Sequence, residues 1–191
     1  VLGQIQVKTN ANKIDAKNKS QISTGVKSKG GINLQNTKIN VNTQANTIEA
    51  KNKSSVQTGV SLNKTTIKNS AINVNTRANT ISAKNNSRIN TGVNADGANI
   101  NKSQINVRTN SRLSEAKNNS RVNTGAQVQG TKIDNSRVNI NTQAPIIQAV
   151  NNSKVNTGLE AKKSEIKNSN ININTRAGYD PAAKNNSVIN H

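Results

Sequence analysis

The chain contains no cysteine, methionine, tryptophan or phenylalanine, and its 191 residues include one tyrosine, one histidine and two prolines. Without cysteine, and with histidine only at the terminal position His191, the sequence offers no thiol chemistry, no disulfide and no usual zinc or haem ligand set. Ile, Val and Leu together number 40 residues. Such a composition excludes a conventional globular core, and no apolar run is long enough to span a membrane.

One polar-apolar phrase fills the whole chain. Its first apolar residue, which we call the anchor, recurs every 16 to 18 residues. The anchors are Ile5, Ile22, Ile39, Val56, Ile72, Ile89, Ile105, Val122, Val138, Val155, Ile171 and Ile189. Alternate phrases resemble each other more than neighbours do, so the full sequence period is 33 residues. A fixed period is typical of a solenoid or another repeat array.

In the odd phrases, Val or Ile follows the anchor at +2 and Thr follows at +4, with polar residues between them. This period of two is strand spacing, so these side chains are predicted to form an inward core ladder. The ladder is represented by Ile39, Val41, Thr43, Ile72, Val74, Thr76, Ile105, Val107 and Thr109. An Ala at +11, as at Ala50 and Ala83, predicts a second short strand.

The even phrases have Thr at +2 and Gly at +3, and a second strand is predicted around Ile67, Ile100, Ile133 and Ile166. Asn-Lys-Ser and Asn-Asn-Ser separate the phrases, as expected for turns with left-handed residues. We therefore predict an all-β fold: a single β-solenoid domain over residues 1–191, with about eleven stacked strand-turn-strand coils of 16–17 residues. At a rise of roughly 4.8 Å per coil, the rod would be about 53 Å long.

Two other conformations are disfavoured. A disordered chain is suggested by the polar, charged composition, but it has no reason to keep Ile and Val at fixed intervals. A helical chain is disfavoured because β-branched residues and Asn fill the repeats without a period of 3.6. Stacking would stabilise the coils through ladders of identical Ile, Val, Thr and Asn side chains.

Charge is the second strong signal. Lys and Arg number 27 against 8 acidic residues, which gives a net charge of +19, and they are scattered along the repeats at outward or turn positions. This charge favours polyanion partners such as acidic polysaccharide or extracellular DNA. The alternative interpretation is that the charge keeps the stacked strands soluble and discourages their side-by-side aggregation.

Catalytic constellations are sparse. Asp15, Glu49 and Glu115 share the +10 position of odd phrases, next to Lys residues at +12. We expect both columns to point outward as a solvated ion-pair ladder. The sequence therefore predicts no enzyme, no cofactor, no metal and no small-molecule substrate.

Gly recurs at +3 of the even phrases, at Gly25, Gly59, Gly92, Gly125 and Gly158. A Gly within a strand marks a bulge or the close approach of another backbone. The column is interpreted either as a local bend needed in every second phrase or as a groove that accepts a neighbouring filament or ligand. Both interpretations remain open at this stage.

The ends favour polymerisation, because the phrases begin and stop without an atypical capping segment. The expected assembly edges are Ile5, Val7 and Thr9 in the first strand and Ser187 and Ile189 in the last. The last phrase departs from the pattern around Tyr179 and Pro181, where we expect a joint between subunits or a partial cap.

These cysteine-free, Asn-rich strand-turn-strand repeats resemble the curlin-like subunits of bacterial extracellular fibres. The resemblance implies a secreted subunit of a cross-β functional amyloid that self-assembles into a biofilm or surface fibre, with other copies of itself as partners. Two alternatives stay open: a segment of a larger secreted β-helical adhesin or exoprotein, and an ice-binding solenoid, which would need an outward Thr face.

Overall fold

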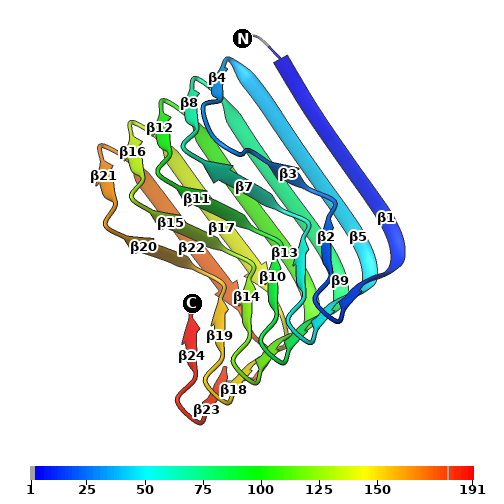
Figure 1. Cartoon of the computed structure of the whole chain (residues 1–191). Helices are drawn as coiled ribbons and strands as arrows, with labels where there is room; N and C mark the ends of the chain where they lie inside the picture. The colour runs from blue at the N-terminus through cyan, green and yellow to red at the C-terminus, as the bar shows by residue number, and fades with distance from the viewer. Residues whose placement is uncertain (1–2, 180) are drawn as a thin grey trace.

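The computed structural model describes residues 3–179 and 181–191, and every regular element within them is a β-strand. The chain winds as a stack of coils from β1 (Gly3–Lys17) to β24 (Val188–Asn190), and these two strands lie at opposite ends of the stack (Figure 1). Neighbouring coils pair through parallel strands, as between β1 and β5 (Thr37–Lys51). The predicted all-β solenoid is confirmed.

The predicted coil length is wrong, because one coil contains 33 residues and the chain forms about six coils rather than eleven. Ile39 pairs with Ile72, which pairs with Ile105, so odd anchors stack only on odd anchors. Even anchors stack in a separate sheet, where Ile89 lies between two Val residues. Stacking at the full period places like side chains on like and preserves their ladders, which stacking at half the period would break. Six coils give a rod of roughly 29 Å rather than 53 Å.

Four parallel sheets, which we name A to D, run along the stack. Sheet A contains β1 (Gly3–Lys17), β5 (Thr37–Lys51), β9 (Ala71–Lys84), β13 (Gln104–Lys117), β17 (Arg137–Gln143), β18 (Ile146–Val150), β22 (Asn170–Arg176) and β23 (Ala182–Lys184). Sheet B contains β2 (Gln21–Ser23), β6 (Ser55–Gln57), β10 (Arg88–Asn90), β14 (Arg121–Asn123), β19 (Lys154–Asn156) and β24 (Val188–Asn190). Sheet C contains β3 (Val26–Lys27), β7 (Val60–Asn63), β11 (Val93–Asp96), β15 (Ala126–Gln129) and β20 (Leu159–Lys162). Sheet D contains β4 (Asn33–Gln35), β8 (Thr66–Lys68), β12 (Asn99–Asn101), β16 (Lys132–Asp134) and β21 (Glu165–Lys167).

The first five coils pass through sheets A, B, C and D in that order, and the last coil contributes strands to sheets A and B. The odd phrase forms sheet A, and the even phrase forms sheets B, C and D. Sheet D is the predicted second strand of the even phrases, whereas sheet C was not predicted. In the first four odd phrases the predicted second strand is continuous with the first, through a position such as Asn46 that has no partner in the strand register. Pro145, which has no backbone N–H, separates β17 from β18 in the fifth coil.

The corners between sheets A and B, C and D, and D and A contain residues with left-handed backbone conformation. Between sheets A and B two successive residues have positive φ, for example Asn85 at 59° and Asn86 at 61°. Asn occupies the first of these positions in all six coils. Between sheets D and A a single residue has positive φ, as at Asn69 with 49°. Asn adopts this conformation more readily than most residues, which explains the recurrence of Asn-x-Ser and Asn-Ser at the corners.

Two separate apolar clusters form the interior. The larger lies between the first part of sheet A and sheets C and D, and includes Ile72, Leu62 and Ile100. The smaller lies between the second part of sheet A and sheet B, and includes Ile81 and Ile89. Within one coil, the buried Thr76 hydroxyl donates to the carbonyl of Thr91 at 3.4 Å, which ties the odd half to the even half.

The Gly column lies at the bend between sheets B and C, and close backbone approach explains it. A Cβ added at Gly59 would overlap the carbonyl oxygen of Gly92 and lie 2.7 Å from the carbonyl carbon of Thr91. The approaching backbone belongs to the next coil of the same chain. The Gly residues of successive coils stack on one another.

Candidate functional site

The described part of the chain contains no group of three or more His, Cys, Asp or Glu side chains placed to hold a metal ion. Nor does it contain a helix long and apolar enough to cross a membrane. The candidate functional features are the side-chain columns on the surface and the two ends of the stack.

The acidic column of sheet A is more buried than expected. Glu49 is 8% exposed and Glu115 is 4% exposed, and Ser82, which lies between them in the column, is 1% exposed. The expectation of a solvated column is wrong for these residues, because each lies between adjacent coils next to a Lys column. Asp15 forms ion pairs with Lys13 and Lys17.

Glu115 lies next to Ser82, the position at which the column has no carboxylate. Lys117 of the same coil lies 2.7 Å from the carboxylate, and Lys84 of the preceding coil lies 3.2 Å from it. The Ser82 hydroxyl donates to the same carboxylate at 2.7 Å. Burial raises the pKa of Glu115, but the bonds from Lys117, Ser82 and Lys84 outweigh burial and hold the pKa below its usual value. The column is therefore a structural ion-pair network between coils.

A partly buried carboxylate, Glu160, lies in the hollow between sheets B and C. Lys154 lies 2.5 Å and Lys162 lies 3.2 Å from its Oε1, and Gln127 donates to its Oε2 at 3.1 Å. Partial burial raises the pKa of Glu160, but these three partners outweigh burial and lower the pKa to about 2. A carboxylate held ionised in this way acts as a structural counter-ion rather than as a proton donor.

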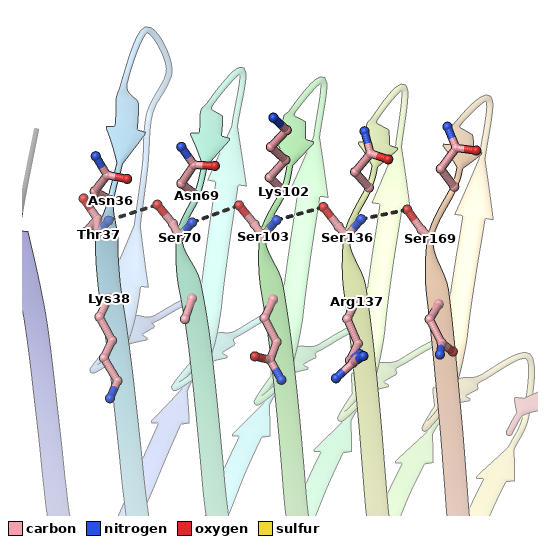
Figure 2. Close-up of a pocket in the computed structure, with 15 residues that line it drawn as sticks. Asn36, Thr37, Lys38, Asn69, Ser70, Lys102, Ser103, Ser136, Arg137 and Ser169 are labelled. Carbon is pink, nitrogen blue, oxygen red and sulfur yellow. Dashed lines mark hydrogen bonds between the residues drawn. The ribbon is translucent and has the colours of Figure 1, made fainter.

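A groove with a volume of about 1140 Å³ follows the corner between sheets D and A. Five successive coils contribute the same three positions to its lining (Figure 2). Its cations are Lys38, Lys102 and Arg137, and no carboxylate lines it.

A hydroxyl ladder forms part of this groove. The backbone N–H of Ser70 donates to Ser103 Oγ at 3.1 Å, and the N–H of Ser103 donates to Ser136 Oγ at 3.1 Å (Figure 2). Each hydroxyl in turn donates to a carbonyl two residues earlier, as from Ser103 to Asn101 at 2.8 Å. A matching Ser ladder follows the corner between sheets A and B. Neither ladder was predicted from the sequence, although a Ser or Thr lies two residues before nearly every anchor.

Amide ladders also run along the stack. The longest follows the corner between sheets A and B, where each Asn Nδ2 donates to the Asn Oδ1 of the preceding coil. Its members are Asn18, Asn52, Asn85, Asn118, Asn151 and Asn185. A second ladder lies on the outer side of sheet A and contains Asn40, Asn73, Asn106, Asn139 and Asn172.

The residues predicted to form the core ladder all lie in sheet A, with their side chains on its inner face. They occupy three in-register columns, and each is at most 3% exposed. These columns are Ile39, Ile72 and Ile105; Val41, Val74 and Val107; and Thr43, Thr76 and Thr109.

The residues named as assembly edges lie in the outermost coils. Ile5, Val7 and Thr9 belong to β1, whose described partner is β5 alone, and Ile189 belongs to β24, which pairs with β19. Ser187 precedes β24 and accepts a hydrogen bond from the backbone N–H of Ser153. Because a coil has 33 residues, the far end of the stack also includes β20, β21, β22 and β23. The prediction of Ser187 and Ile189 as the edge did not include these strands.

The residues named as a possible joint lie beside the break in sheet A. The backbone N–H groups of Gly178 and Tyr179 both donate to the carbonyl of Pro145, at 3.1 and 3.0 Å. The Tyr179 side chain is 71% exposed, and Pro181 is partly buried. The aromatic ring is thus available for contact, and its role in a joint stays a prediction.

Comparison with known proteins adds no further constraint: no protein-family model, curated protein or solved structure matches this chain.

Proposed function

We propose that this chain is a structural subunit of an extracellular fibre that extends by stacking coil on coil. The observation that carries the proposal is the exposure of core positions at the two ends of the stack. Ile5 in the first coil is 37% exposed and Ile173 in the last is 44% exposed, whereas Val41, Val74, Val107 and Ile140, which precede Ile173 in its column, are at most 2% exposed. A further coil would bury these apolar side chains.

The two ends also match in residue type along the columns. The first coil offers an Ile-Val-Thr series at Ile5, Val7 and Thr9, and the last coil offers Ile171, Ile173 and Thr175. A second copy that stacks its first coil on this last coil would continue the apolar and Thr columns without a mismatch of polarity.

The amide ladder supplies complementary hydrogen-bonding groups at the two ends. Asn185 Nδ2 donates to Asn151, while its Oδ1 accepts from no described residue. Asn18 Oδ1 accepts from Asn52, while its Nδ2 donates to no described residue. Stacking the first coil of one copy on the last coil of another brings an unused donor to an unused acceptor.

Such a contact joins two different surfaces, and a head-to-tail contact of this kind produces an open filament unless rotation closes it into a ring. Exposed strand edges favour this addition, because they present unpaired backbone groups. The net charge of +19 opposes it through repulsion between copies, so screening by salt is expected to speed assembly.

A segment of a longer β-helical adhesin or exoprotein is the alternative, since the same end columns would be continued by more coils of one chain. The ice-binding alternative is disfavoured because the Thr columns at Thr76, Thr91 and Thr109 are buried rather than displayed on a flat face.

The experiment follows filament growth by light scattering across salt concentrations, with electron microscopy of the endpoint. We expect long unbranched filaments that form faster as salt rises, and at least tenfold slower growth for Ile173→Lys. The matched control is Ile146→Lys, a residue that is 36% exposed but lies in β18, which is paired on both sides. A chain that stays monomeric at high concentration and moderate salt would overturn the proposal and favour the longer adhesin.

A further inference from the structure

The outer side of the first part of sheet A has an unusual composition, and we call it the amide face. It comprises the outward side chains at alternate positions of 4–10, 38–44, 71–77, 104–110, 137–143 and 170–176. Of these 24 positions, 17 are Asn or Gln, six are Lys or Arg, and one is Ala71. None is acidic, although the chain has eight acidic residues.

The six cations of the amide face occur once per coil, and all are exposed. They are Lys8, Lys38, Arg77, Arg108, Arg137 and Arg176. None of them forms an ion pair with a carboxylate in the described chain. They are not needed to neutralise charge within the fold, and they give the amide face a net positive charge.

The positions of these cations repeat every three coils. Lys8 and Arg108 share one column, Lys38 and Arg137 a second, and Arg77 and Arg176 a third. With a rise of about 4.8 Å per coil, equivalent cations recur roughly every 14 Å along the stack. Random placement of surface Lys and Arg for solubility would not require this order.

The amides beside the cations are available for hydrogen bonding. The side chains of the Asn40 column form their own ladder, but the side-chain amides of Asn42, Asn75 and Asn141 in the next column form no hydrogen bond with a described residue. Asn is also a poor residue for strand positions, so strand propensity does not account for this column. A shallow hollow of about 330 Å³ over these coils is lined by both kinds of side chain, including Asn42, Arg77 and Arg108.

We propose that the amide face binds a linear acidic polysaccharide, with carboxylates or sulfates on the Lys and Arg side chains and sugar hydroxyls on the free amides. The density of charge favours this ligand over duplex DNA. The face presents one cation per coil, or about one per 4.8 Å of axis, whereas duplex DNA carries a phosphate per roughly 1.7 Å. The absence of aromatic side chains on the face also removes the stacking platforms that single strands use.

The proposal is independent of fibre assembly, because the end coils and the amide face use different surfaces. It is tested with polygalacturonate, which has a carboxylate on every sugar, by calorimetric titration between about 50 and 200 mM salt. The fully methyl-esterified polymer is the neutral comparison, and random duplex DNA is the competing polyanion.

Two triple variants of equal net charge separate the amide face from overall charge. The face variant is Arg77→Gln, Arg108→Asn, Arg137→Gln, and the control variant is Lys19→Asn, Lys53→Asn, Lys132→Asn. Each substitution introduces a side chain that another coil carries in the same column. The three control lysines are exposed and lie outside the face. We expect the face variant to bind polygalacturonate at least tenfold more weakly, and the control variant to change affinity by less than about twofold.

A charge-neutral variant, Asn75→Ala with Asn141→Ala, tests the amides. We expect about threefold weaker binding with an unchanged dependence on salt, because no cation is lost. The proposal is overturned if both triple variants weaken binding equally, if the esterified polymer binds as well as the acid, or if duplex DNA binds more tightly and depends equally on the face. An unchanged affinity in the Asn variant would remove the amides from the proposed site.

Discussion

A Cβ at Gly92 would overlap the carbonyl oxygen of Gly125 and lie 2.9 Å from its carbonyl carbon, although the two residues are one full coil apart. The bend between sheets B and C thus brings successive backbones closer than any side chain allows. This relationship holds at four positions of the Gly column, from Gly25 to Gly125.

Gly92→Ala is therefore expected to lower the free energy of unfolding by about 3 kcal/mol or more, because the overlap is with backbone that cannot rotate away. Chemical denaturation measures the change. Gly3→Ala is the matched control, since no atom lies within 4 Å of the added Cβ. Equal stability of the two variants would contradict the close approach.

Truncating the core ladder should destabilise the stack far more than truncating its outer side. Ile72→Ala removes a side chain that is 1% exposed, and we expect a loss of about 2 to 5 kcal/mol. Asn75→Ala removes an exposed side chain of the same strand and should change stability by less than about 0.5 kcal/mol. Thermal unfolding monitored by circular dichroism distinguishes them, and similar losses would mean that the inward and outward assignment is reversed.

The corner residue Asn85 has two roles that can be separated by substitution. It has a φ of 59° and its amide bonds to Asn52 at 3.0 Å and Asn118 at 2.9 Å. Asn85→Gly keeps the left-handed conformation and loses only the ladder bonds, at a cost of about 1 kcal/mol. Asn85→Ala loses the bonds and adds about 1 kcal/mol or more of backbone strain. If denaturation shows that Asn85→Gly is as destabilising as Asn85→Ala, the left-handed conformation does not account for the stability that Asn85→Ala loses.

Acid should weaken the stack through Glu160. Its folded pKa of about 2 lies below its usual 4.5, so its contribution to stability is complete above the usual value and is lost as the pH falls toward 2. We expect the unfolding midpoint in denaturant to fall over this range, and Glu160→Gln to flatten part of that fall. Asp96→Asn, in the same hollow but without an ion pair to a described cation, serves as the control and should leave the fall in place.

Particular residues show how far the sequence alone could predict the site. The inward series Ile72, Val74, Thr76 could be read from alternation because strand geometry is local. The burial of Glu115 could not, because it depends on Lys84 and Ser82 of the preceding coil. The amide face was also missed as a unit, since its cations lie in three different columns and become one surface only when six strands are placed side by side.

The sequence by itself determined the solenoid class, because a fixed repeat of strand-forming residues and turn-forming Asn leaves few other ways to bury so little apolar surface. It also contained the 33-residue period. Only the tertiary structure decided that this period is one coil rather than two, since the choice depends on which distant strands pair. Stacking at the full period sets Gly on Gly, Asn on Asn and Ile on Ile, and the hydrogen bonds and close contacts of those ladders exist in no other register.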